Sequence, residues 1–92
     1  MVHYIVHGET DTVGVMVADA REDQSLTGWN MAKDSTVRMK ARQAIPLGHK
    51  IALTDMAKDD QVIKYDEPIG NASKIVTRGQ HVHTHNLKSA RW

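Results

Sequence analysis

The stretch Gly8-Glu9-Thr10-Asp11-Thr12-Val13-Gly14-Val15-Met16-Val17 shows the pattern on which this chain is built. Four turn-forming residues come first, and valines at every second position follow them. Alternation with a period of two is typical of a β-strand, whereas an amphipathic helix needs apolar residues at i, i+3, i+4 and i+7. The stretch therefore predicts a turn that leads into a strand.

The same alternation recurs on both sides of this stretch, at Val2, Tyr4 and Val6 and again at Val37, Met39 and Ala41. Turn formers lie between these segments at 22–25 and 31–35, and hairpin connections are the simplest interpretation. No stretch keeps helical spacing for ten positions, so at most one helical turn is expected, near 53–57. The sequence predicts an all-β domain of short strands and tight turns.

The second half repeats a weaker motif, in which a turn residue precedes an apolar residue by three places. The three pairs are Gly48 and Ile51, Asp59 and Val62, and Gly79 and Val82. Glycine accepts a positive φ at little cost, whereas aspartate adopts it with some strain. We expect three turn-then-strand units, of which the middle one is the least ideal.

Composition excludes several classes of protein. The 92 residues make one small domain, and 12 Lys and Arg against 11 Asp and Glu give a net charge of +1, with no basic stripe for nucleic acid. The chain has no cysteine, so it forms neither disulfides nor thiolate sites. Without a signal-like leader or a run of 18 apolar residues, we expect a soluble cytoplasmic protein with no membrane partner.

The strongest local signal for chemistry is His81-Val82-His83-Thr84-His85-Asn86. In a strand, alternation would send the imidazoles of His81, His83 and His85 to one face, where they could share a metal ion. An exposed polar face on an edge strand fits the same pattern. So does an anion site in which the histidines and the Asn86 amide meet a substrate carboxylate.

Two further segments carry polar groups next to turns. Pro46-Leu47-Gly48-His49-Lys50 places His49 and Lys50 after a turn, where donors can converge on an anion. Lys64 and Tyr65 come just before a Pro-containing turn at 66–70 and could both meet a ligand. Taken alone, each pair is more simply explained by a structural role. Nucleotide-binding and common hydrolase motifs are absent from the sequence.

Together, three motifs resemble the N-terminal SAF domain of the altronate and galactarate dehydratase family. They are Gly48-His49-Lys50-Ile51-Ala52-Leu53, Val62-Ile63-Lys64-Tyr65 with Pro68-Ile69-Gly70, and His81-Val82-His83-Thr84-His85-Asn86, in that order. The opening, with His7 and 11–15, and the ending 86–92 also fit. Asp59 and Asp66-Glu67 depart from the family, which commonly has glycine at these two turns.

The resemblance implies a β-clip over 1–86, followed by a basic and aromatic tail at 87–92. It also implies a separate small subunit, as in the two-subunit sulfolactate sulfo-lyase, of a lyase that acts on a sugar acid of the altronate or galactarate type or on sulfolactate. Iron(II) or another divalent metal and most catalytic groups would then lie on a large partner subunit. This chain would bind and orient the hydroxy acid and would be inactive alone.

Carried over by position, the residues expected to bind substrate are His49, Lys50, Lys64, Tyr65, His83, His85 and Asn86. We assign no catalytic residue and no certain metal ligand to this chain. Two alternatives stay open at this point: a non-catalytic SAF module that binds a sugar acid or a protein, and a histidine-rich metal-binding protein that uses His81, His83 and His85.

Overall fold

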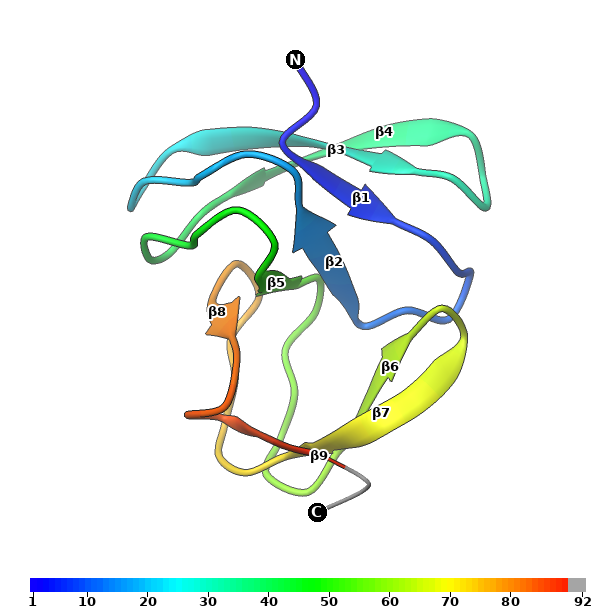
Figure 1. The fold of residues 1–92 in the computed structure, drawn as a ribbon, viewed down its shortest axis with the longest axis vertical. Coiled ribbons are helices and arrows are strands. Elements are labelled where there is room, and N and C mark those ends of the chain that lie inside the picture. Colours follow the sequence, from blue (N-terminus) through cyan, green and yellow to red (C-terminus); the bar gives the residue numbers. More distant parts are fainter. Residues whose placement is uncertain (90–92) are drawn as a thin grey trace.

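A computed structural model describes residues 1–89, which form nine strands and no helix (Figure 1). The strands are β1 (Tyr4–Val6), β2 (Val13–Met16), β3 (Ser25–Asn30), β4 (Ser35–Lys40), β5 (Lys50–Ala52), β6 (Gln61–Lys64), β7 (Glu67–Ala72), β8 (His81–Val82) and β9 (Leu87–Ser89). The predicted all-β class is confirmed. Residues 1–89 accordingly offer no helix that could span a membrane.

The strands form two sheets. The larger has the order β4-β3-β1-β2-β5-β8, and the smaller has the order β6-β7-β9. In the larger sheet, β1 pairs antiparallel with β2 and parallel with β3. Figure 1 shows β4, β3 and β1 of the larger sheet at the top and the smaller sheet at the bottom, with β2, β5 and β8 of the larger sheet between them. A meander could not produce this order, so the chain folds back across itself.

Four turns, rather than the predicted three, share one design. Each has a buried apolar residue, a residue with positive φ three places later, and a second buried apolar residue three places after that. The four units are Ala20-Asp23-Leu26, Ile45-Gly48-Ile51, Met56-Asp59-Val62 and Val76-Gly79-Val82. As expected, Asp59 adopts the left-handed conformation, with φ at +76°.

These units pair two by two and divide the domain into related halves. Ala20 and Ile45 exchange backbone hydrogen bonds of 2.8 and 3.0 Å, and Met56 and Val76 exchange bonds of 2.8 and 2.9 Å. The first pair of units packs into one buried cluster with Tyr4 and Met16. The second pair packs into another with Val13 and Ala72. Each half thus has its own small apolar core, as suits a short chain.

The two halves meet where β5 pairs antiparallel with β8, with Lys50 opposite Val82 and Ile51 opposite His81. Each of these strands follows a glycine turn, at Gly48 and Gly79, whose φ angles are +87° and +91°. The turns therefore bring the segments after Gly48 and after Gly79 side by side. This pairing positions the candidate site.

Several local expectations need correction. The strand expected over His81–Asn86 ends at Val82, and residues 83–86 form a turn. The turn after Lys64 lies at Tyr65 and Asp66, both with positive φ, whereas Pro68 lies within β7 beside a register shift. Residues 53–57 form no helical turn, which agrees with the expectation of at most one. In the expected tail, Leu87–Ser89 form β9 and pair with β7, and residues 90–92 lie outside the described part.

Candidate functional site

Four histidines gather where β5 and β8 pair, and we call them the histidine face: His49, His81, His83 and His85. Nδ1 of His49 lies 2.8 Å from Nε2 of His81, and the His49 and His83 rings stack with centroids 4.1 Å apart. The His85 ring lies 5.1 Å from that of His81. His49 is 32 residues from His81 in sequence, so only the strand pairing brings it here.

Asn86 holds the turn that carries two of these histidines. Its Oδ1 accepts a hydrogen bond from the His83 backbone N–H at 2.9 Å, and its Nδ2 donates to the His81 carbonyl at 2.8 Å. The side chain is buried, with 5% of its surface exposed. In this structure the Asn86 amide positions the histidine face, and its predicted contact with substrate stays a prediction.

The local environment favours the neutral imidazole at two residues of this face, His81 and His83. Burial lowers the pKa of His81 below its ordinary value, and nearby positive charge on His85, His49, His83 and Lys50 lowers it further. Loss of solvent also lowers the pKa of His83, as do His49, Lys50 and His85. A neutral imidazole can accept a proton or ligate a metal ion, and it remains a hydrogen-bond donor through its other nitrogen.

Lys50 adds a cation whose charge acts on His81 and His83. Burial lowers the pKa of its ammonium group, and the positive charge of Lys64 lowers it further. The shift identifies a partly dehydrated lysine that has another cation close by. An anion bound between Lys50 and the imidazoles would relieve this repulsion, since opposite charge favours the protonated form.

The histidine face also has the geometry of a candidate metal centre. One nitrogen from each of His49, His81 and His83 can be chosen so that all three lie within 4.8 Å of one another, and all three residues are half-buried. The sequence instead suggested His81, His83 and His85. Neutral imidazole suits zinc, iron, copper and nickel, so the donor set fits a divalent transition metal with open coordination positions.

Lys64 and Tyr65 form a second group at the turn between β6 and β7. The Lys64 ammonium lies 5.4 Å from the centre of the Tyr65 ring. That ring stacks on His7 at 4.1 Å, and the Tyr65 hydroxyl lies 3.3 Å from Nε2 of His7. The charge of Lys64 acting on Lys50 links this group to the histidine face. Sequence spacing gave no sign of the contact between His7 and Tyr65, which are 58 residues apart.

Comparison with known protein families decides what kind of domain this is. A model of the altronate/galactarate dehydratase SAF domain matches residues 2–90. The chain belongs to this family. The suspected resemblance is thereby confirmed, and with it the small all-β SAF domain.

Two kinds of relative share this SAF domain. The chain is 45% identical over 92 residues to the (2R)-sulfolactate sulfo-lyase subunit alpha of Chromohalobacter salexigens, and the match covers 99% of this chain and 98% of that protein. It is 41% identical over 86 residues to the altronate dehydratase of Escherichia coli, but there the match covers only 16% of the relative. The SAF domain therefore occurs both as a chain of this length and as a small part of a larger protein.

The SAF-family motifs take distinct places in the structure. The first and third motifs, 48–53 and 81–86, provide β5, β8 and the whole histidine face, whereas the middle motif forms the hairpin of β6 and β7. Asp59 and Asp66, which lie at the two turns where the resemblance led us to expect glycine, both adopt positive φ, at +76° and +58°. Glycine would adopt these angles with less strain.

Proposed function

We propose that this chain is the small subunit of a metal-dependent lyase that removes water or sulfite from a hydroxylated carboxylic acid, and that a large subunit completes the active site. The relatives support a subunit of a lyase, because the one that matches end to end is called subunit alpha of a sulfo-lyase. We also assign the protein to the cytoplasm, since a chain without cysteine needs no oxidising compartment.

The observation that carries the proposal is the contact of His49 with His81 and His83, together with the charge of Lys50 acting on His81 and His83. Elimination from a hydroxy acid begins with loss of a proton next to a carboxylate, so negative charge accumulates on the substrate. Lys50 and the imidazole N–H groups supply donors for the carboxylate or sulfonate and hold the acid in one orientation. A metal on the large subunit would supply the Lewis acid.

This role predicts that His83→Ala and Lys50→Ala each lower turnover of the two-subunit complex at least tenfold, or about 1.4 kcal/mol of transition-state stabilisation. Each removes one charge-assisted or imidazole contact to the acid. The measurement is turnover with altronate, galactarate and sulfolactate, with folding checked by circular dichroism. Lys74→Ala, at an exposed lysine that is not one of the residues of the histidine face, is the matched control. Full turnover in both variants would exclude a role of His83 and Lys50 in holding the acid.

The three facing nitrogens of His49, His81 and His83 favour a second candidate function, in which this chain itself binds a divalent metal. Calorimetry of the isolated chain with zinc, nickel or iron(II) should then show one site. His49→Ala and His83→Ala should abolish tight binding, because each removes one of three ligands. His85→Ala should weaken it less, since His85 lies outside the trio. No heat of binding for any of the three metals would dismiss this function.

A further inference from the structure

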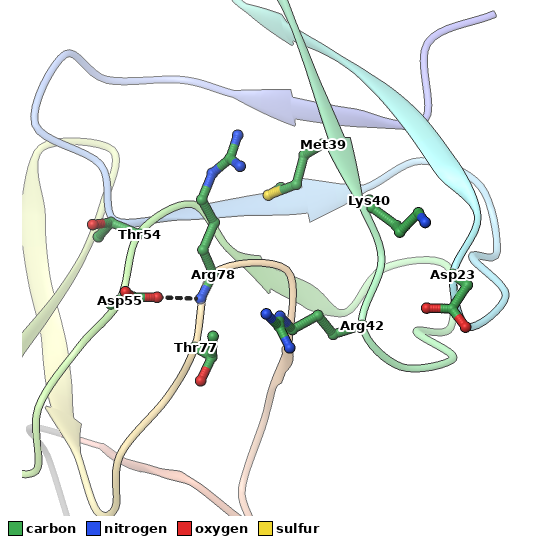
Figure 2. A pocket seen from close by; sticks show the side chains of 8 residues that line it. All are labelled: Asp23, Met39, Lys40, Arg42, Thr54, Asp55, Thr77 and Arg78. Atoms are coloured by element: carbon green, nitrogen blue, oxygen red, sulfur yellow. Dashed lines mark hydrogen bonds between the residues drawn. The ribbon is translucent and has the colours of Figure 1, made fainter.

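A cleft with no contribution from the histidine face opens where the end of β4 meets the turn at 77–80 (Figure 2). Its volume is about 610 Å³, within the range of ligand pockets. Eight residues line it: Asp23, Met39, Lys40, Arg42, Thr54, Asp55, Thr77 and Arg78. The cleft is therefore large enough for a small organic molecule and presents three cations to it.

A glycine makes this gathering of cations possible. A Cβ atom at Gly79 would lie 2.6 Å from the carbonyl oxygen of Lys40 and 3.3 Å from Cγ of Arg42. Only glycine lets the turn approach so closely, and the Arg42 N–H then donates to the Gly79 carbonyl at 2.9 Å. Arg78, the residue before Gly79, is thereby placed beside Lys40 and Arg42.

The wall of this cleft holds three cations and two carboxylates, Asp23 and Asp55, and no ion pair joins them within residues 1–89. Asp55 lines the cleft, but its Oδ1 accepts the backbone N–H of Arg78 at 2.8 Å. The side chains of Lys40 and Arg42 have no hydrogen-bond or ion-pair partner among the described residues, and Arg78 reaches only the Arg38 carbonyl, at 3.5 Å. Like charges held together repel, and a bound anion would offset that cost.

The other residues around the cleft indicate which further groups a ligand would carry. The Thr54 and Thr77 hydroxyls line the cleft without a partner in residues 1–89, so they can donate to an oxyanion. A second cavity of about 200 Å³ shares Met39 and Arg78 with the cleft and is otherwise largely apolar, with Tyr4, Val6, Val37 and Leu53 in its wall. The hydrogen-bond donors of the cleft thus lie next to an apolar cavity that could accommodate the carbon skeleton of a ligand.

We propose that this cleft binds a small organic acid through its carboxylate or sulfonate, at a site separate from the histidine face. Arg42 and Arg78 hold the acid group, the two threonines add hydrogen bonds, and the carbon skeleton reaches toward Met39. The site goes beyond the proposed function, because its lining shares no residue with the histidine face and does not include Lys50.

Succinate and sulfate, titrated separately into the full chain at pH 7 and followed by NMR, test the site. We expect succinate to bind with a Kd of about 1 mM or tighter, and more tightly than sulfate, which has no carbon to bury. Arg42→Gln and Arg78→Gln should each weaken succinate binding at least fivefold. Lys74→Gln and His83→Ala should leave it unchanged, and the latter separates this cleft from the histidine face.

Three outcomes would overturn the proposal. Succinate could fail to bind below 10 mM, which is on the order of ten times the expected Kd. His83→Ala rather than the arginine variants could abolish binding, which would place the acid at the histidine face. Alternatively, succinate could fail to bind the free chain, while the double variant Arg42→Gln/Arg78→Gln no longer sediments together with the large subunit. That result would make a partner carboxylate the occupant.

Discussion

Two polar junctions join segments of this chain that lie far apart in sequence, and they differ in how fully their polar atoms are used. One is the histidine face. The other, which we call the carboxylate junction, ties the turn Gly8–Asp11 to the turn at Tyr65 and Asp66. There Oδ1 of Asp66 accepts two hydrogen bonds of 2.7 Å from Thr10, and Asp11 accepts the N–H groups of Asp66 and Gly8 at 2.8 and 3.0 Å.

At the histidine face, by contrast, imidazoles face one another. The contact between ring nitrogens of His49 and His81, at 2.8 Å, is the one side-chain hydrogen bond among the four rings within residues 1–89. The carboxylate junction uses its polar groups to hold the fold, and the histidine face keeps donors and acceptors available. Polar groups satisfied within the chain contribute to stability, whereas available ones indicate function. Changes to the two junctions should therefore have different consequences.

The largest expected loss of stability comes from Gly8→Ala at the carboxylate junction. An added Cβ would lie 2.5 Å from Cγ of Asp66 and 2.7 Å from its backbone nitrogen, so the two turns must separate. We expect the free energy of unfolding to fall by about 2–3 kcal/mol, the cost of overpacking, as measured by urea denaturation. Gly48→Ala is the comparison, because its methyl group meets nothing within 4 Å and only the positive φ is strained.

A smaller effect should appear in acid. Hydrogen bonds from the Thr10 backbone and side chain lower the pKa of Asp66 below its ordinary 3.8. Because the folded-state pKa is the lower one, the stabilisation is complete well above pH 3.8 and is lost as the pH falls through the folded pKa. Urea midpoints between pH 6 and 3 should therefore fall more steeply for the wild type than for Asp66→Asn. Parallel curves would mean that the junction carboxylate contributes nothing.

The smallest effect on stability is expected at the histidine face. His83→Ala removes a half-buried ring that stacks on His49 but accepts no side-chain hydrogen bond. The free energy of unfolding should therefore change by less than about 0.5 kcal/mol. Urea denaturation, compared with the turnover assay, should show that the variant loses turnover while its stability is unchanged. A loss as large as that of Gly8→Ala would make the histidine face a structural element and end the contrast between the two junctions.

Much of the secondary structure followed from local signals. Alternation at 13–17 and the turn formers before it predicted β2 and its turn, and the pairs that begin at Gly48, Asp59 and Gly79 predicted three of the four related turns. Turn formers at 22–25 predicted the first of the four as well, but its likeness to the other three was missed, although Asp23 and Leu26 have the same spacing as Asp59 and Val62. Strand β7 was missed as well, since Pro68 favours a turn and its place in a strand depends on a register shift opposite Ile63.

The candidate site was only partly predictable. The row of histidines at 81–85 was visible in sequence, but the reason given for it, strand alternation, was wrong beyond Val82. Residues 83–86 instead form a turn, which the buried Asn86 amide stabilises by hydrogen bonds to the backbone of His83 and His81. Spacing in the sequence does not predict these bonds. The spacing of residues in the sequence gave no indication that His49 would contact His81 and His83.

By itself, the sequence determined that this is an all-β domain with glycine or aspartate at its strained turns, because alternation and positive φ are properties of neighbouring residues. The tertiary structure alone decided that His49 joins the third motif and that Arg78 lies beside Arg42. Both meetings depend on strand pairing and close backbone approach between segments about 30 or more residues apart, as loop closure permits but does not specify. Contacts between segments so far apart in sequence form only when the whole chain is packed.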